Sequence, residues 1–281
     1  MECLRTRMVT PGPNQARQPP ERAVGFATLS DAGRQRLQNE DACGSQETDQ
    51  GVVLAVADGV SGEEGGEIAS RTAIDETLRA YRESPEAWGP ARRLYRAAQQ
   101  ANIEVYDRAS VVTELRRMAT TLTAIAVEGG VVYGAHIGDS RLYLVRDGRI
   151  EQKTKDHTVA ATRQRIGVVR ADRVKDHPLR STLTRSLGRE LIAAIDRLSF
   201  PVRQGDTLLV CTDGLHNVLS DEHMCERVAG RDAEEACKTL IDDANARGAP
   251  DNITAAIARV MHVTAAVQGS GWRGLLARLI E

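Results

Sequence analysis

Short apolar segments rich in β-branched residues recur along the sequence, and most of them end at a glycine-containing turn. Two of these turns, Glu128-Gly129-Gly130-Val131 and Asp147-Gly148, have the compact form that joins antiparallel neighbours. The segments with strand composition are 23–29, 51–58, 120–128, 131–138, 140–148, 206–214 and 252–260. This arrangement predicts antiparallel sheets and argues against a regular alternation of strand and helix.

Helical periodicity appears between and after these segments. One helix is expected from about residue 64 to 81. A second has an apolar face formed by Leu94, Ala98, Ala101, Val105 and Ala109. A third is expected at about 233–246, because Gly248 and Pro250 follow it. Helices that cover sheets built from hairpins define an α+β fold.

The composition is that of a globular protein and excludes several other classes. The 281 residues suit one domain, with 41% hydrophobic and 27% charged residues. A formal net charge of −2 gives no basic field for a phosphate backbone, so we expect no nucleic-acid partner. Five scattered cysteines without a C-x-x-C pair argue against a disulfide framework and a zinc site, and indicate a cytoplasmic protein.

The two ends of the chain differ from its middle. Prolines and glycine predict a flexible arm over residues 1–21, so the folded domain is expected at 22–261. Residues 262–281 form a linker followed by a short stretch with one apolar helical face. The residues of that face are Trp272, Leu275, Leu276, Leu279 and Ile280. Such a helix either docks on its own domain or contacts a protein or membrane surface.

Aspartates stand beside glycine or asparagine after several of the apolar segments. The pairs are Asp58-Gly59, Gly138-Asp139, Asp213-Gly214 and Asp251-Asn252. Any single pair is more often an ordinary turn, as at Asp147-Gly148. An aspartate that directly follows a buried strand, however, projects a carboxylate from a rigid support. Four such positions, with oxygen ligands alone, are typical of a site for Mg²⁺ or Mn²⁺.

Eight motifs in order resemble the protein phosphatase 2C family of metal-dependent phosphatases. They are G-R-Q-R-L-Q-N-E-D (33–41), A-D-G-V-S-G (57–62), M-A-T-T-L-T (118–123), G-D-S-R-L-Y-L (138–144), K-D-H-T (155–158), L-T-R-S-L-G (183–188), C-T-D-G-L (211–215) and D-N-I-T (251–254). The resemblance therefore runs from Gly33 to about Val260. It implies a four-layer α/β/β/α sandwich, with two antiparallel sheets flanked by helix pairs and a flap at about 158–182.

The resemblance also implies roles for individual residues. Asp58 would bridge two metal ions, and the Gly59 carbonyl would bind one of them. Asp213 and Asp251 would complete the protein ligands of the second ion, which Glu40 would reach through water.

Three further assignments follow from the same resemblance. Asp41 would orient the cluster, and Arg36 would bind the substrate phosphate. Asp139 would bind a third ion, and Asp213 would be a ligand shared between that ion and the core pair. The expected cofactors are thus two core Mn²⁺ or Mg²⁺ ions and a third.

The activity that the resemblance implies is hydrolysis of phosphoserine and phosphothreonine on proteins by a metal-bridging hydroxide. The substrates would be products of a Ser/Thr kinase. Val60 occupies the position where many eukaryotic members have a histidine general acid, so a metal-bound water is the simplest proton donor. His136, His157 and His216 are expected to be structural.

Two other readings stay open on the sequence. A pseudophosphatase would keep the fold as a phosphoprotein-binding or regulatory module. A different two-metal phosphoesterase would act on nucleotides or small phosphate esters, although such sites usually mix histidine with aspartate. The retained aspartates and the absence of histidine from the predicted ligand set favour the protein phosphatase.

Overall fold

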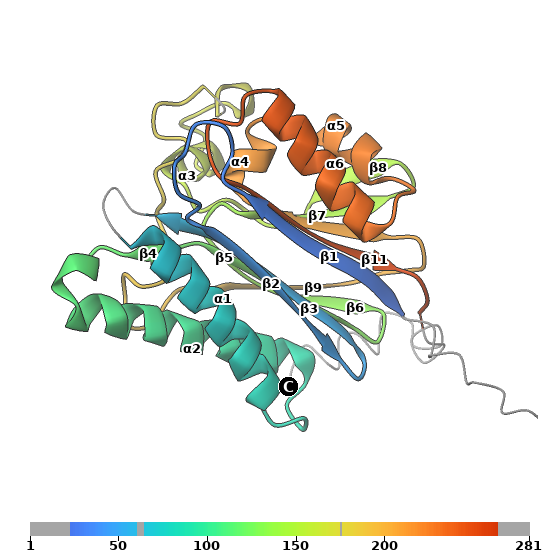
Figure 1. Ribbon diagram of the computed structural model, residues 1–281, viewed down its shortest axis with the longest axis horizontal. Coiled ribbons are helices and arrows are strands. Elements are labelled where there is room, and N and C mark those ends of the chain that lie inside the picture. The colour runs from blue at the N-terminus through green and yellow to red at the C-terminus, as the bar shows by residue number, and fades with distance from the viewer. Residues whose placement is uncertain (1–22, 61–64, 175, 264–281) are drawn as a thin grey trace, which may run out of the picture.

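The computed structural model describes residues 23–60, 65–174 and 176–263 (Figure 1). The arm expected at 1–21 and the apolar helical face expected at 272–280 lie outside the described residues. Figure 1 shows two sheets stacked on each other, with α1 and α2 outside one sheet and α5 and α6 outside the other. The predicted α+β class and the four-layer order are confirmed.

The first sheet has six strands, all paired antiparallel. Its path runs through β2 (Asp41–Thr48), β3 (Gly51–Val60), β5 (Leu122–Glu128), β6 (Val131–Ile137) and β9 (Asp196–Pro201). The short strand β4 (Ala119–Thr120) pairs with the end of β3. Leu122 to Glu128 are buried throughout, because this central strand is covered on both faces.

The second sheet has five antiparallel strands and brings together the two ends of the domain. Its order is β1 (Val24–Asp31), β11 (Ile253–Val260), β10 (Thr207–Cys211), β7 (Arg141–Arg146) and β8 (Arg149–Gln152). The register pairs Val24 with Val260 and Asp31 with Ile253. The first strand of the domain is therefore held by its last.

Helices cover the outer face of each sheet. α1 (Gly66–Glu83) and α2 (Pro90–Val111) pack on the six-stranded sheet. α4 (Asp213–His216), α5 (Asp221–Val228) and α6 (Ala233–Ala246) pack on the five-stranded sheet. α3 (Val159–Arg165) and the 3₁₀ turns η1 (Thr113–Leu115) and η2 (Ala171–Arg173) lie in the connections. Among the described helices, none combines the length and apolar character needed to cross a bilayer.

The layer between the two sheets is filled by side chains from both of them. Leu54 and Ile125 come from the six-stranded sheet, while Leu142, Leu208 and Ala256 come from the five-stranded sheet, and all are buried. Period-two alternation sends the other side chains of the same strands toward the helices. This inner layer fixes how the strand ends of one sheet face those of the other.

Both predicted hairpin turns are confirmed. Gly129 and Gly130 have φ of 56° and 75°, and Asp147 and Gly148 have φ of 51° and 71°. Two successive left-handed residues give the turn whose twist matches the flanking strands. The helix expected at 233–246 has those bounds, whereas the first helix runs two residues later than expected at each end, at Gly66–Glu83.

The inner layer generates a test of the packing. Ile125→Ala should lower the free energy of unfolding by about 2–5 kcal/mol, because it opens a cavity where no solvent enters. Denaturant unfolding measures this value. The matched control is Ile192→Ala, since Ile192 is 76% exposed and should change stability by less than about 0.5 kcal/mol. Equal effects of the two substitutions would contradict the assigned inner layer.

Candidate metal site

Acidic residues from separate elements gather at one end of the sandwich. Asp58 lies near the end of β3, Asp139 follows β6, Asp213 begins α4 and Asp251 precedes β11. Figure 1 shows α3, α4 and β4 at this same end of the molecule. β3 and β6 belong to the six-stranded sheet, and β10 and β11 to the five-stranded sheet. Stacking of the two sheets therefore makes neighbours of residues nearly 200 positions apart in the sequence.

Asp41 connects the cluster to both sheets. Its register partner on β3 is Asp58, so the two residues lie side by side in the six-stranded sheet. The Asp41 carboxylate is buried and accepts hydrogen bonds from the hydroxyls of Thr212 (2.8 Å), which directly follows β10, and Thr254 (2.7 Å) in β11. Burial raises the pKa of Asp41, while these two hydroxyls lower it.

The carboxylates of the cluster repel one another. Burial raises the pKa of Asp58 well above its usual range, and the nearby charges of Asp41, Asp213, Asp139 and Asp251 raise it further. Burial and then Asp251 likewise raise the pKa of Asp213, although a side-chain hydrogen bond with Asp58 lowers it. Carboxylates this close share their site most stably with a cation, so the donor chemistry fits a hard divalent ion.

Gly59 lies where a side chain has no room. A Cβ at this position would be 2.3 Å from the Gly66 carbonyl oxygen and 2.6 Å from that of Glu40. The Gly59 N–H donates to the Glu40 carbonyl at 3.1 Å. The backbone after Asp58 is thereby held close to the segment that carries Glu40. A site that uses the Gly59 carbonyl together with nearby carboxylates requires this closeness.

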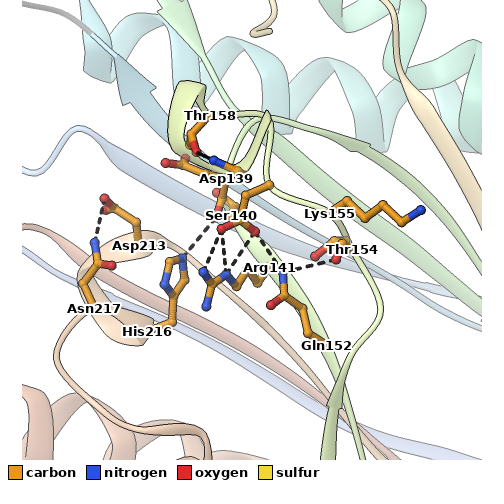
Figure 2. A network of polar contacts seen from close by, with 12 residues as sticks. Asp139, Ser140, Arg141, Gln152, Thr154, Lys155, Thr158, Asp213, His216 and Asn217 are labelled. Atoms are coloured by element: carbon orange, nitrogen blue, oxygen red, sulfur yellow. Dashed lines mark hydrogen bonds and ion pairs between the residues drawn. The ribbon is translucent and has the colours of Figure 1, made fainter. Parts of the chain in front are cut away.

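Asp139 is positioned by two histidines. The Gly138 N–H donates to Nδ1 of His157 at 3.1 Å, and the His157 N–H donates to the Gly138 carbonyl at 2.8 Å. His216 donates from Nε2 to the Asp139 carbonyl at 3.0 Å. Figure 2 shows the contact of His216 with Asp139, and Asp213 beside Asn217. The Asp139 side chain is buried, and burial raises its pKa well above the usual range.

The histidines themselves are part of the fold. His136 lies between the Thr123 hydroxyl and the Lys155 carbonyl, and its ring is 4.8 Å from that of His157. Burial lowers the pKa of His136 to about 4, and it also lowers the pKa of His216. These rings are neutral at pH 7, and each has at least one hydrogen-bond partner, although Nδ1 of His216 has none. Their contacts are those of structural residues.

Arg36 and Asp251 form an ion pair at the rim of the cluster. Arg36 Nη2 lies 2.9 Å from Asp251 Oδ2, and both side chains are partly exposed. The other oxygen, Oδ1, accepts from the Asn252 N–H at 2.9 Å. Both oxygens of Asp251 are thus already bound. In the described ranges, no group of three or more His, Cys, Asp or Glu side chains stands ready to hold a metal ion.

Mg²⁺ and Mn²⁺ retain several waters and need few protein ligands, so a complete protein cage is not required. A carboxylate has about four lone-pair sites, so Asp251 can keep its contacts with Arg36 and Asn252 and still offer lone pairs to a metal ion. The structure therefore brings the predicted residues together but leaves one of them paired with the predicted phosphate-binding arginine.

Asn252 is a residue whose contribution was not foreseen from the sequence. Its Nδ2 donates to the carbonyls of Ala32 (3.0 Å) and Gln38 (2.9 Å), and its Oδ1 accepts from the Glu40 N–H at 2.8 Å. One side chain therefore fixes the loop that carries Arg36 and Glu40. The only signal in the sequence was its place in the D-N-I-T motif, which gives no hint of partners more than 200 residues away.

Comparisons with known proteins show which family the chain resembles. The model of the family described as protein phosphatase 2C matches residues 32–255. The serine/threonine protein phosphatase PstP of Mycobacterium tuberculosis is 35% identical over 240 residues, covering 84% of this chain and 45% of that protein. The serine/threonine phosphatase stp of Listeria innocua is 33% identical, covering 80% of this chain and 91% of its own length.

The chain is also similar to a solved phosphatase structure. The catalytic domain of PstP in complex with two manganese ions superposes with a TM-score of 0.74 at 32% identity, covering 85% of this chain and 98% of that domain. The chain belongs to the protein phosphatase 2C family. It spans less than half the length of the Mycobacterium tuberculosis relative and most of the Listeria relative.

The Asn252 contacts generate a test that does not depend on activity. Asn252→Ala should accelerate amide hydrogen exchange across residues 32–40 by about tenfold or more, because three hydrogen bonds to that loop disappear. The matched control is Asn245→Ala, another buried asparagine, whose amide nitrogen donates to Asp31. That variant should leave the exchange of Glu40 unchanged. Slow exchange of the Glu40 amide in Asn252→Ala would show that other contacts hold the loop.

Proposed function

We propose that this protein is a metal-dependent phosphatase that hydrolyses phosphoserine and phosphothreonine on other proteins. The observation that carries the proposal is the cluster of Asp139, which is buried, with the half-buried Asp58 and Asp213, in a chain of this family. The relatives named above are serine/threonine phosphatases. The Mycobacterium tuberculosis relative is more than twice as long as the matching region, so its whole activity is not transferred by similarity alone.

In this proposal the carboxylates hold two core ions. Asp58 would contribute to both ions and the Gly59 carbonyl to the first. Asp213 and Asp251 would contribute to the second, with Glu40 nearby. When bound, Mn²⁺ or Mg²⁺ would supply positive charge for the phosphoryl group and lower the pKa of a water molecule toward neutrality.

The chain's own residues perform the remaining tasks. Asp41 fixes Asp58 through the pairing of β2 with β3, and its two threonine hydrogen bonds keep it in place. Arg36 binds the substrate phosphate, whose charge replaces that of Asp251 as its partner.

The leaving serine or threonine oxygen needs a proton. Val60 stands after Asp-Gly, and the three buried histidines already hold partners in the fold. We therefore assign this proton to water at the site and not to a side chain. The pseudophosphatase reading is not supported, since Asp58, Asp213 and Asp251 are all retained and the relatives are named as phosphatases.

The biological setting remains a prediction. We propose substrates phosphorylated by a Ser/Thr kinase in the cytoplasm, with the flap at about 158–182 beside the site. We further propose that residues 22–261 form the catalytic domain, and that residues 262–281 are an added segment that contacts a protein or a membrane surface. The support for that division is that every assigned ligand precedes Val260 and that the family match ends at residue 255.

Loss of the bridging carboxylate tests the proposed function. Asp58→Asn should reduce hydrolysis of an aryl phosphate by roughly 100-fold or more, because the ions lose the charge that holds them together. Mn²⁺ should raise the melting temperature of the parent protein but not that of the variant. The control is Asp242→Asn on the exposed side of α6. Undiminished activity of Asp58→Asn in metal-chelated buffer would overturn the proposal.

The third ion requires a separate experiment. Asp139→Ala should remove one weakly bound Mn²⁺ per chain while two remain, because Asp139 is not assigned to the core pair. Counting bound Mn²⁺ by calorimetry or by its spin-resonance signal at increasing concentration gives the result directly. We expect activity to fall while the fold is kept. An unchanged number of bound ions would remove Asp139 from the ligand set.

A further inference from the structure

A pocket of about 250 Å³ lies at the end of α2, the helix that packs outside the six-stranded sheet. One wall is the last part of α2, where Tyr106, Ala109 and Ser110 share a helix face. The other residues that line it are Arg116, Arg117, Met118, Gly188 and Arg189. Three of its eight lining residues are thus arginines, in a chain whose net charge is −2.

The walls of the pocket are fixed by hydrogen bonds. The Gly188 N–H donates to Oδ1 of Asn102 at 3.0 Å, and Nδ2 of the same asparagine donates to the carbonyls of Glu190 and Leu191. The segment that carries Arg189 is therefore held against α2. A site formed in advance loses little entropy when a ligand binds.

Two of the pocket arginines, Arg116 and Arg189, keep a charge that no described residue of the pocket offsets. Across the described ranges, the Arg116 and Arg189 side chains make no ion pair or hydrogen bond, and no acidic residue lines the pocket. Glu114 and Glu190 are near Arg116 and Arg189 in the sequence, but neither glutamate lines the pocket. Exposed guanidinium groups around a concave surface attract carboxylate and phosphate groups.

The pocket stands close to the proposed catalytic centre. Met118 directly precedes β4, whose Thr120 pairs with Gly59, and Leu187 before Gly188 forms a bridge with the same Thr120. Backbone spacing along and between strands puts the pocket wall about 10–15 Å from Gly59. An extended peptide covers that distance in about three to five residues.

We propose that this pocket binds an acidic side chain of the protein substrate, three to five residues from the phosphorylated serine or threonine. The proposal rests on the proposed function and adds to it a class of preferred substrate. The arginines do not touch the reacting phosphate, so they affect the binding of the peptide and not the chemical step.

The test compares phosphothreonine peptides that carry glutamate or alanine at positions three to five, on either side of the phosphothreonine. The parent protein should favour a glutamate peptide in kcat/KM by about three- to tenfold, mainly through KM, because exposed charge contacts are individually weak. The double variant Arg116→Ala with Arg189→Ala should lose this preference. Its hydrolysis of aryl phosphate should stay unchanged.

Arg149→Ala serves as the matched control, since Arg149 is an exposed arginine of β8 in the other sheet. The charge-reversed variant Arg116→Glu should shift the preference toward lysine at the same position. Equal use of all peptides by the parent protein, or a preference that survives the double variant, would overturn the proposal. Failure of the proposed function would look different, because then neither peptide nor aryl phosphate would be hydrolysed with Mn²⁺.

Discussion

The buried carboxylate of Asp41 joins the two sheets at the end that carries the acidic cluster. Its backbone pairs with β3 beside Asp58, while its side chain accepts from Thr212, which directly follows β10, and from Thr254 of the opposite sheet. Thr254 also donates its N–H to the Thr212 hydroxyl, so the three residues form one network. A buried charge is stable only when it is paired or hydrogen-bonded. The hydrogen bonds from Thr212 and Thr254 meet this condition for the Asp41 carboxylate.

The same network keeps several carboxylates closer together than their charges favour. The inner apolar layer stabilises this arrangement, because it fixes the two sheets and so prevents the aspartates from moving apart. Burial is the largest cause of the raised pKa of Asp58, and the second is this repulsion. Divalent cations would relieve it, so the feature that costs stability is also the one that gives the site its affinity for metal.

Central elements of the fold could be predicted from the sequence because they depend on local pattern. β5 and β10 are covered on both faces and appear as continuous apolar segments, and the glycines of the tight turns mark the hairpins. β2, with the sequence DACGSQET, was not predicted, because this edge strand is half buried and carries no apolar alternation. α4 is a single turn that starts at Asp213, and its Asp-Gly pair indicated only a turn.

The candidate site, like the fold, was predictable from the sequence only in part. Its aspartates could be named from motifs, but their relations could not, because the contacts of Asn252 and the ion pair of Arg36 join residues more than 200 positions apart. The central claim is that the end of the sandwich around Asp58 holds two metal ions. Anomalous diffraction from crystals grown with Mn²⁺ tests it most directly. Two manganese peaks that both contact the Asp58 carboxylate are predicted, and the absence of any peak there at millimolar Mn²⁺ would contradict the account.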